Sequence, residues 1–420
     1  AASYNNLTDK DEIVNKDAVS MLVSLGIIEG KPDGSYAPTE NVDRAQMAKM
    51  LSVIMNKGVD NSALYQSVNS GLVDVNTNWA KGHINYCYTT GIIAGRGNGT
   101  FDPSATVTAL EAAKMLLVAV GYDPAIEGFE GTDWAIKTAS LAEQGIFEGF
   151  TKDLSAPLNR DDAALLIYNA LDVEMIQSYT TNNYPIAYSD HRTILADKYG
   201  VIKVQGVVVA NEWASLASDD GDAALKEGKT TIYNGEGIFS TTGNTTVSKE
   251  DASLKTQTFN VSTPVDMLGK TVNLYIKKTT ILADSTVYGD PVVSDVNTVV
   301  TTGETVLYSG AKDPQVDYDK LLGENGLTDK DAKYFWNYNS GKYIPNTTEK
   351  YGDKTANVKG ATLTIIDNNG DGTVDIIFQE TAAISKVSSY NTKDEKLTLS
   401  GIGSIDFDEI ANYDDVAKDD

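Results

Sequence analysis

Residues 7–172 of this 420-residue chain repeat one pattern, and this repetition restricts the fold more than any single residue does. Gly26-Ile-Ile-Glu-Gly30 and Gly91-Ile-Ile-Ala-Gly95 are near-copies that start 65 residues apart, since 91 − 26 = 65. Gly145-Ile-Phe-Glu-Gly149 is a shorter relative. The first two copies continue into a glycine loop that ends in an aromatic residue, one further residue and proline. Such a repeat is a supersecondary unit that buries its apolar face against its neighbours.

Each copy then shows a helix-start signal, a short polar residue followed three positions later by an acid or an amide. The first side chain accepts a free backbone N–H at the helix start, and the later one reaches back to the cap. Apolar residues follow at i, i+3, i+4 and i+7, which predicts helices with one buried face, packed around a pseudo-threefold axis. The pairs are Asp43 and Gln46, Thr108 and Glu111, and Asn159 and Asp162.

The helix ahead of the second glycine motif carries Ala80, Ile84 and Cys87 on one stripe. Cys87 is the single cysteine, so an intrachain disulfide is excluded, and its position indicates a buried apolar side chain and not a reactive thiol. His83 lies on the same helix and is expected to be structural or at the surface.

This order of features resembles the S-layer homology family, and Asn78-Trp79-Ala80 and Asp133-Trp134-Ala135 are further marks of it. The resemblance implies an all-α spindle of three repeats, with grooves that bind secondary cell-wall polysaccharide, often through a terminal pyruvylated sugar. We place the repeats at residues 1–58, 70–122 and 130–172.

The resemblance also implies a set of polysaccharide-binding residues. A pyruvyl ketal is a fixed carboxylate that a guanidinium can hold through two parallel hydrogen bonds, and an aromatic face can cover the apolar side of a sugar ring. The plainer alternatives are that the caps and tryptophans are structural and that the cations are solvated. The implied residues are Arg44, Gln46, Lys49, Trp79, Arg96, Gly97, Glu111, Lys114, Trp134 and Arg160.

Three positions depart from the family pattern. Ala109 stands in place of the motif arginine in the second copy, so Arg96 and Lys114 are the expected cations there. The third copy has Leu165 in place of the second basic residue, and the first copy has Val14 in place of tryptophan. We therefore expect an intact groove from the first two copies and no site that needs all of the third.

The chain changes character near residue 173, where Thr, Val, Ile, Tyr, Asn and Gly begin to dominate short runs broken by turn residues. This predicts a connector over 173–200 with helical character toward 194–198, and then all-β domains at 201–295 and 296–420. The β domains are expected to be barrels or sandwiches, with a short helix at 327–332. The predicted class is thus multidomain, an all-α spindle followed by all-β domains.

One loop in the last domain has the spacing of a calcium site. Oxygen-bearing side chains recur at positions 1, 3, 5 and 9, Gly372 is at position 6, and Thr373 can lend a carbonyl. Position 12 is Phe378 instead of glutamate, and the flanks are typical of strands, so the prediction is a calcium-binding β-hairpin. A metal-free Asn/Gly/Asp turn is the alternative. The predicted ligands are Asp367, Asn369, Asp371, Thr373 and Asp375.

Charge and motifs restrict the function. The chain has 34 basic and 59 acidic residues, a net charge of −25, which disfavours nucleic acid and anionic lipid as partners. No apolar run is long enough to span a membrane, and no Cys/His cluster, nucleophile elbow or phosphate-binding loop is present. The start, Ala1-Ala2-Ser3, fits a stub left by signal-peptide cleavage.

The leading hypothesis is a secreted, non-enzymatic structural protein of the cell wall and its S-layer. The repeats would anchor it to pyruvylated secondary cell-wall polysaccharide, and copies would self-assemble into a lattice, tube or filament. The alternatives are an anchored adhesin or binding protein, or an anchored hydrolase whose catalytic part is unrecognised.

Overall fold

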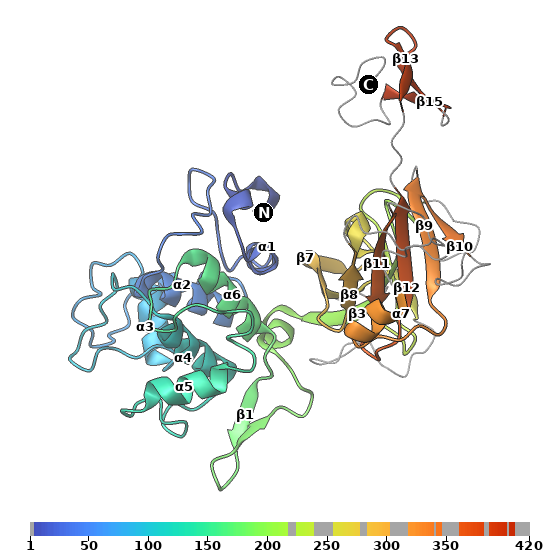
Figure 1. Ribbon diagram of the computed structural model, residues 1–420. Helices are drawn as coiled ribbons and strands as arrows, with labels where there is room; N and C mark the ends of the chain where they lie inside the picture. The colour runs from blue at the N-terminus through green and yellow to red at the C-terminus, as the bar shows by residue number, and fades with distance from the viewer. Residues whose placement is uncertain are drawn as a thin grey trace. The chain divides into compact units, whose positions relative to one another are not determined.

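The chain divides into two compact units, Ala1–Asn297 and Thr298–Asp420, in a computed structural model (Figure 1). The first unit holds the helices and one five-stranded sheet, and the second holds the remaining β structure and one helix. The structure describes residues 4–216, 224–238, 255–277, 284–302, 318–339, 342–346, 361–381, 386–400 and 403–407.

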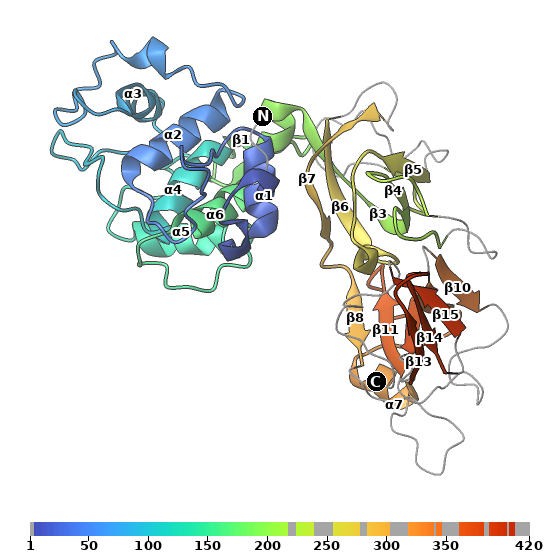
Figure 2. The same cartoon turned by 90° about the horizontal axis from the view of Figure 1, so that it is seen from above.

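The helical part confirms the prediction of a helical N-terminus. Within residues 4–172 the α-helices form three consecutive pairs, α1–α2, α3–α4 and α5–α6. The second helix of each pair packs against the first helix of the next, and α6 returns to α1, which closes the arrangement (Figure 2). Their bounds are α1 Lys16–Ser24, α2 Arg44–Met55, α3 Lys81–Thr89, α4 Ala109–Val120, α5 Trp134–Ala142 and α6 Arg160–Leu171.

A ring of three backbone hydrogen bonds joins the segments just ahead of α2, α4 and α6. Val42 N donates to Leu158 O at 2.8 Å, Leu158 N to Val107 O at 2.7 Å, and Val107 N to Val42 O at 3.0 Å. All three residues are buried, so each bond replaces a costly unpaired backbone group. The expected pseudo-threefold arrangement is therefore present in the backbone.

The predicted caps are confirmed at the start of α2 and α4, and in part at α6. Asp43 accepts from Gln46 N at 2.7 Å while its own N–H donates to Gln46 Oε1 at 3.0 Å. Thr108 and Glu111 make the same reciprocal pair. At α6, Asn159 accepts from Asp162 N at 2.8 Å. The carboxylate of Asp162 forms an ion pair with Lys152 at 2.6 Å.

The apolar stripes meet in one core. Ala80, Ile84 and Cys87 are fully buried, as their spacing predicts, and Cys87 Sγ lies 3.4 Å from Ala48 O. Burial raises the pKa of the Cys87 thiol far above its usual value, which keeps it protonated. The expectation of an unreactive cysteine is therefore confirmed.

The connector contains a five-residue π-helix, Leu195–Tyr199, close to the predicted helical segment. It also contains a β-hairpin that the sequence did not predict, β1 Ile176–Tyr179 and β2 Pro185–Ala187. Both strands are short, so the sequence shows no alternation of apolar and polar residues long enough to predict them.

The first β region is a five-stranded antiparallel sheet in the order β5-β4-β3-β6-β7. Among the described residues its outer strands β5 and β7 do not pair with each other, so the expected barrel is not found here. Residues Val201–Asn211 form one long strand, β3, with a bulge between Val208 and Ala210. The bounds are β3 Val201–Asn211, β4 Thr230–Tyr233, β5 Thr256–Phe259, β6 Thr271–Lys277 and β7 Thr286–Val293.

The second unit has a mixed sheet, β10-β9-β12-β11-β8, in which β12 and β9 run parallel. A three-stranded antiparallel sheet β13-β14-β15 follows. The described strands here form open sheets and no barrel. The bounds are β8 Thr298–Thr301, β9 Lys333–Asn339, β10 Lys342–Asn346, β11 Ala361–Asp367, β12 Ile376–Thr381, β13 Val387–Asn391, β14 Lys396–Leu399 and β15 Gly403–Asp406.

The helix predicted at 327–332 is wrong, because the helix of this region is α7, Tyr318–Glu324. The backbone of Thr328 bonds to the neighbouring turn instead, donating to Gly372 O at 2.9 Å and accepting from Val374 N at 2.8 Å. Asp329 accepts hydrogen bonds from the hydroxyls of Tyr318 and Tyr334. Long-range pairing therefore outweighs the local helix signal.

Candidate functional site

A cleft of about 570 Å³, here called cleft A, lies at the junction of all three helix pairs. Arg44 comes from the start of α2, the glycine loop and Lys114 from the second pair, and Trp134 from the start of α5. Its volume is in the range of small-molecule sites. The predicted residues that line it are Arg44, Arg96, Gly97, Glu111, Lys114 and Trp134.

A second cleft of about 470 Å³, cleft B, repeats this arrangement one step round the ring. Arg160 at the start of α6 takes the place of Arg44, Lys49 that of Lys114, and Trp79 that of Trp134. The first glycine loop, residues 27–32, forms its wall. The predicted residues that line cleft B are Gln46, Lys49, Trp79 and Arg160, so the two clefts together collect every residue of the predicted polysaccharide-binding set.

Arg44 is built into the wall of cleft A. Its Nε donates to Phe101 O at 2.8 Å, its Nη2 donates to Ala94 O at 2.7 Å, and its guanidinium carbon lies 4.5 Å from the centre of the Phe101 ring. The residue is 4% exposed. Burial, with the nearby Arg96 charge, lowers the pKa of Arg44 to about 10, so it remains charged at neutral pH.

Arg160 repeats this bonding in cleft B. Its Nε donates to Tyr36 O at 2.7 Å and its Nη2 to Glu29 O at 3.2 Å, with the guanidinium 4.8 Å from the Tyr36 ring centre. The sequence predicted that these arginines would hold a ligand carboxylate with two parallel bonds. In both clefts, two N–H groups of the fork are already bonded to glycine-loop carbonyls, so the arginines fix the loop as well as supplying charge.

The lysines and tryptophans are more accessible than Arg44. Lys114 Nζ lies 5.4 Å from the centre of the Trp134 ring, a cation–π contact, and Lys49 Nζ lies 3.4 Å from Glu29 Oε2. Desolvation is the main reason that the pKa of Lys114 is lowered. Trp79 is 59% exposed at the edge of cleft B. An exposed indole can cover the apolar face of a sugar ring, and a cation beside it can pair with a carboxylate on that sugar.

The capping residues also face the clefts. Glu111 Oε2 accepts from Thr108 N at 3.2 Å, and its Oε1 lies 3.5 Å from Arg96 Nη1. The amide of Gln46 takes the same position in cleft B. One side chain thus serves the helix start and the cleft wall, so the structural and functional interpretations of these residues are compatible.

The third equivalent position has lost this chemistry, as the sequence indicates. Ala109 occupies the arginine position at the start of α4, and Leu165 of α6 the lysine position. Val14, 81% exposed, occupies the tryptophan position. Asp161 accepts from the backbone N–H groups of Val14 and Asn15, so its carboxylate ties α6 to the first pair.

Two aspartates that shape the clefts escaped the sequence analysis. Asp9 accepts hydrogen bonds from Tyr36 N at 2.7 Å and Ala37 N at 2.8 Å. Asp74 accepts the equivalent bonds from Phe101 N at 2.8 Å and Asp102 N at 2.7 Å. Ala37 and Asp102 have φ values of +55° and +61°, which are rare for these residue types. The available signal was the spacing, because 74 − 9 = 65, the repeat length of the glycine motifs.

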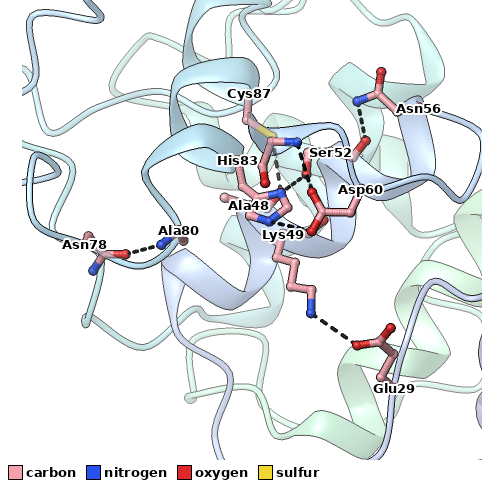
Figure 3. A network of polar contacts seen from close by, with 11 residues as sticks. Glu29, Ala48, Lys49, Ser52, Asn56, Asp60, Asn78, Ala80, His83 and Cys87 are labelled. Carbon is pink, nitrogen blue, oxygen red and sulfur yellow. Dashed lines mark hydrogen bonds and ion pairs between the residues drawn. The ribbon is translucent and has the colours of Figure 1, made fainter. Parts of the chain in front are cut away.

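A buried polar network lies behind cleft B (Figure 3). His83 Nδ1 lies 2.6 Å from Ser52 Oγ, and Nε2 lies 3.7 Å from Asp60 Oδ2. Ser52 also bonds to the backbone carbonyl of Lys49, the lysine of cleft B. The network joins α2 to α3 and confirms His83 as a structural residue.

The predicted calcium ligands lie in the turn between β11 and β12, so the expected hairpin is confirmed. Asp367 accepts from the N–H groups of Asn369, Gly370 and Gly372, and Asp371 Oδ1 accepts from Thr373 N. Within the described parts of the chain, no three Asp, Glu, His or Cys side chains are arranged to hold a metal. Calcium binding stays a prediction.

Comparison with known proteins agrees with the geometry. A model of the S-layer homology domain family matches residues 6–48 and 73–113, and each segment covers the first helix of a pair, α1 or α3, and the start of the second, α2 or α4. These two segments are S-layer homology domains. The third helix pair falls outside the match, and in it Leu165 stands in place of the lysine. No helix among the described residues is long and apolar enough to cross a membrane.

This chain is similar to several proteins of bacterial surfaces. It is 28% identical to a cell surface protein of Thermoanaerobacter kivui over 57% of this chain and 29% of that protein. It is 23% identical to the surface-layer 125 kDa protein of Lysinibacillus sphaericus over 95% of this chain and 30% of that protein. An uncharacterized cell wall amidase of Bacillus anthracis is 30% identical over 29% of this chain and 24% of that protein. The chain thus spans less than a third of each of these relatives.

We predict that Arg44→Met destabilises the first unit by about 2–5 kcal/mol, because it removes two charge-assisted hydrogen bonds and leaves two carbonyls unpaired. Urea unfolding followed by circular dichroism measures this change. Lys114→Met is the control and is expected to cost about 1 kcal/mol or less, the value of a partly exposed cation–π contact. Equal stability of the Arg44 variant and the wild type would contradict a wall-building role.

His83 gives a prediction about pH. Burial lowers the pKa of His83 further than the Asp60 charge raises it, and Lys49 adds to the lowering. Folding therefore favours the neutral ring, so its contribution to stability is complete above the unfolded pKa of about 6.5 and is lost as pH falls through the lower folded pKa. The drop in melting temperature between pH 7.5 and pH 5.5 should therefore shrink in His83→Gln. The idea fails if this variant keeps the wild-type drop.

Proposed function

We propose that this protein is a non-enzymatic structural component of the bacterial cell surface, held to the wall by its N-terminal helices. The observation that carries the proposal is the duplication of one constellation in clefts A and B. In each cleft an arginine bonded to the glycine loop, a lysine and a tryptophan stand at matched positions. The names of the relatives support a location at the cell wall and outer surface.

The ligand proposed for the clefts is an acidic secondary cell-wall polysaccharide, with a pyruvyl carboxylate as its charged group. Lys114 and Lys49 would bind the carboxylate, and Trp134 and Trp79 would stack on the sugar ring. The arginines, already bonded to the glycine loops, would add a positive field without direct contact being required. The family's binding of such polysaccharide agrees with this donor set.

We infer that the third helix pair is a diverged copy of the same repeat, which completes a three-repeat spindle. Its place in the hydrogen-bond ring and its helix start at Asn159 support this view. The third equivalent position, with Ala109, Leu165 and Val14 in place of the arginine, the lysine and the tryptophan, would bind no acidic glycan. Two polysaccharide sites per chain are therefore expected.

We further propose that the β-rich parts build an ordered array of copies. The 95% coverage of this chain by the match to a surface-layer protein supports this role. The match to an amidase covers 24% of that enzyme and supports a shared segment, not a shared activity.

Loss of the cleft lysines should weaken binding to the glycan. Lys114→Ala and Lys49→Ala should each abolish one of two sites, or weaken it about tenfold to a hundredfold, the effect of one charge-assisted hydrogen bond. Calorimetry with purified, pyruvylated wall polysaccharide gives both stoichiometry and affinity. Lys226→Ala, an exposed lysine far along the chain from the clefts, is the matched control.

Removal of the pyruvyl groups should reduce wild-type binding to the level of the Lys49/Lys114 double variant. The anchoring mechanism would be overturned if the wild type and the two single lysine variants all bound depyruvylated polysaccharide with the same affinity.

We keep calcium as a proposal for the loop of Asp367, Asn369, Asp371, Thr373 and Asp375. Desolvation, followed by the charges of Asp367 and Asp371, raises the pKa of Asp375, and a bound cation would relieve that repulsion. Calcium should raise the melting temperature of the second unit, and a chelator should lower it. Asp371→Asn, which keeps the turn acceptor but removes a charge, should reduce the calcium effect. A melting temperature that does not respond to chelation would refute the proposal.

A further inference from the structure

The hairpin of β1 and β2 is an uncharged projection on a strongly acidic chain. No charged side chain lies between Glu174 and Asp190, whereas the whole chain carries a net charge of −25. Figure 1 shows this hairpin extending away from the helices. It belongs to neither cleft, so anchoring does not explain it.

The hairpin is fastened to the helical part at both ends of β1. Tyr179 Oη accepts from Asp123 N at 2.9 Å and donates to Glu127 Oε1 at 2.8 Å. Gly121, at the end of α4, packs so closely that a Cβ there would lie 2.4 Å from Ile176 O. The projection is therefore held in one orientation, which lowers the entropy lost when it binds a partner.

The outer part of the hairpin exposes apolar side chains. Tyr184 is 69% exposed and Ile186 is 41% exposed, with exposed Pro185 between them. The proline and the irregular register between Ile176 and Ser178 limit further strand pairing, so the side chains are the available contact. Protein interfaces are enriched in tyrosine and depleted in charged residues, as this surface is.

We propose that this hairpin is a contact surface for a second copy of this chain. Two copies with a charge of −25 each repel over most of their surfaces, so an uncharged, apolar projection is where they can approach closely. An acidic glycan is a poorer occupant because the hairpin offers no cation. This inference rests on the proposed array.

The contact is small compared with the roughly 800 Å² per partner of a stable complex. It therefore forms weakly between isolated chains and contributes when many copies are held together on a wall, where effective concentration is high.

Sedimentation velocity over a concentration series, with the full chain, tests the inference. Tyr184→Asp places a repelling charge in the contact and should raise the concentration needed for assembly about tenfold or more. Tyr184→Phe keeps the ring and should assemble as the wild type does. Ile136→Asp adds the same charge at another apolar residue, 75% exposed on α5, and should also have no effect. Melting curves establish that each variant is folded.

Assembly of Tyr184→Asp at the wild-type concentration overturns the inference, and so does an equal loss in Ile136→Asp. Polysaccharide binding is measured on the same samples. A wild type that binds polysaccharide but stays monomeric at every concentration removes the array and this contact together, and leaves the anchoring proposal standing.

Discussion

The ring of backbone hydrogen bonds through Val42, Val107 and Leu158 is the constraint on which the helical part depends. Each member lies directly ahead of the N-cap of a long helix, so the ring fixes where α2, α4 and α6 begin. In two cases the residue after the cap is an arginine, Arg44 or Arg160. The ring thereby aims both guanidinium groups at the glycine loop of a neighbouring pair. The two matched clefts follow from one backbone geometry. The side chains at the three equivalent positions decide which of them form a cationic cleft.

Within the clefts, the work is divided between buried and accessible cations. A guanidinium that is bonded to two carbonyls and covered by an aromatic ring is held rigidly, which suits a fixed positive field. A lysine on a flexible stem, with one face against an indole, can adjust to a ligand carboxylate. Because the arginine also holds the loop, its removal would confound loss of binding with loss of structure. The lysines therefore give the cleaner information about recognition.

The sequence predicted the helical part well because its signals are local and repeated. Caps such as Asp43 with Gln46, and stripes such as Ala80, Ile84 and Cys87, are written within single helices. Asp9 and Asp74 were missed because their partners lie 27 and 28 residues away. The β-rich part was harder, since sheet order depends on long-range register. The parallel pairing of β9 with β12 and the capture of Thr328 by a distant turn have no signature within a short window.

An acidic protein that binds an acidic glycan must overcome repulsion at long range. In the proposed complex the clefts would overcome this repulsion by concentrating cations within one Debye length of the ligand, while the net charge of −25 acts over the rest of the surface. Added salt would screen the overall repulsion and the cleft attraction together, so the two effects oppose each other. The same repulsion would keep copies apart except at uncharged projections. On these proposals, the distribution of charge over the chain determines both where it binds the wall glycan and where it contacts another copy.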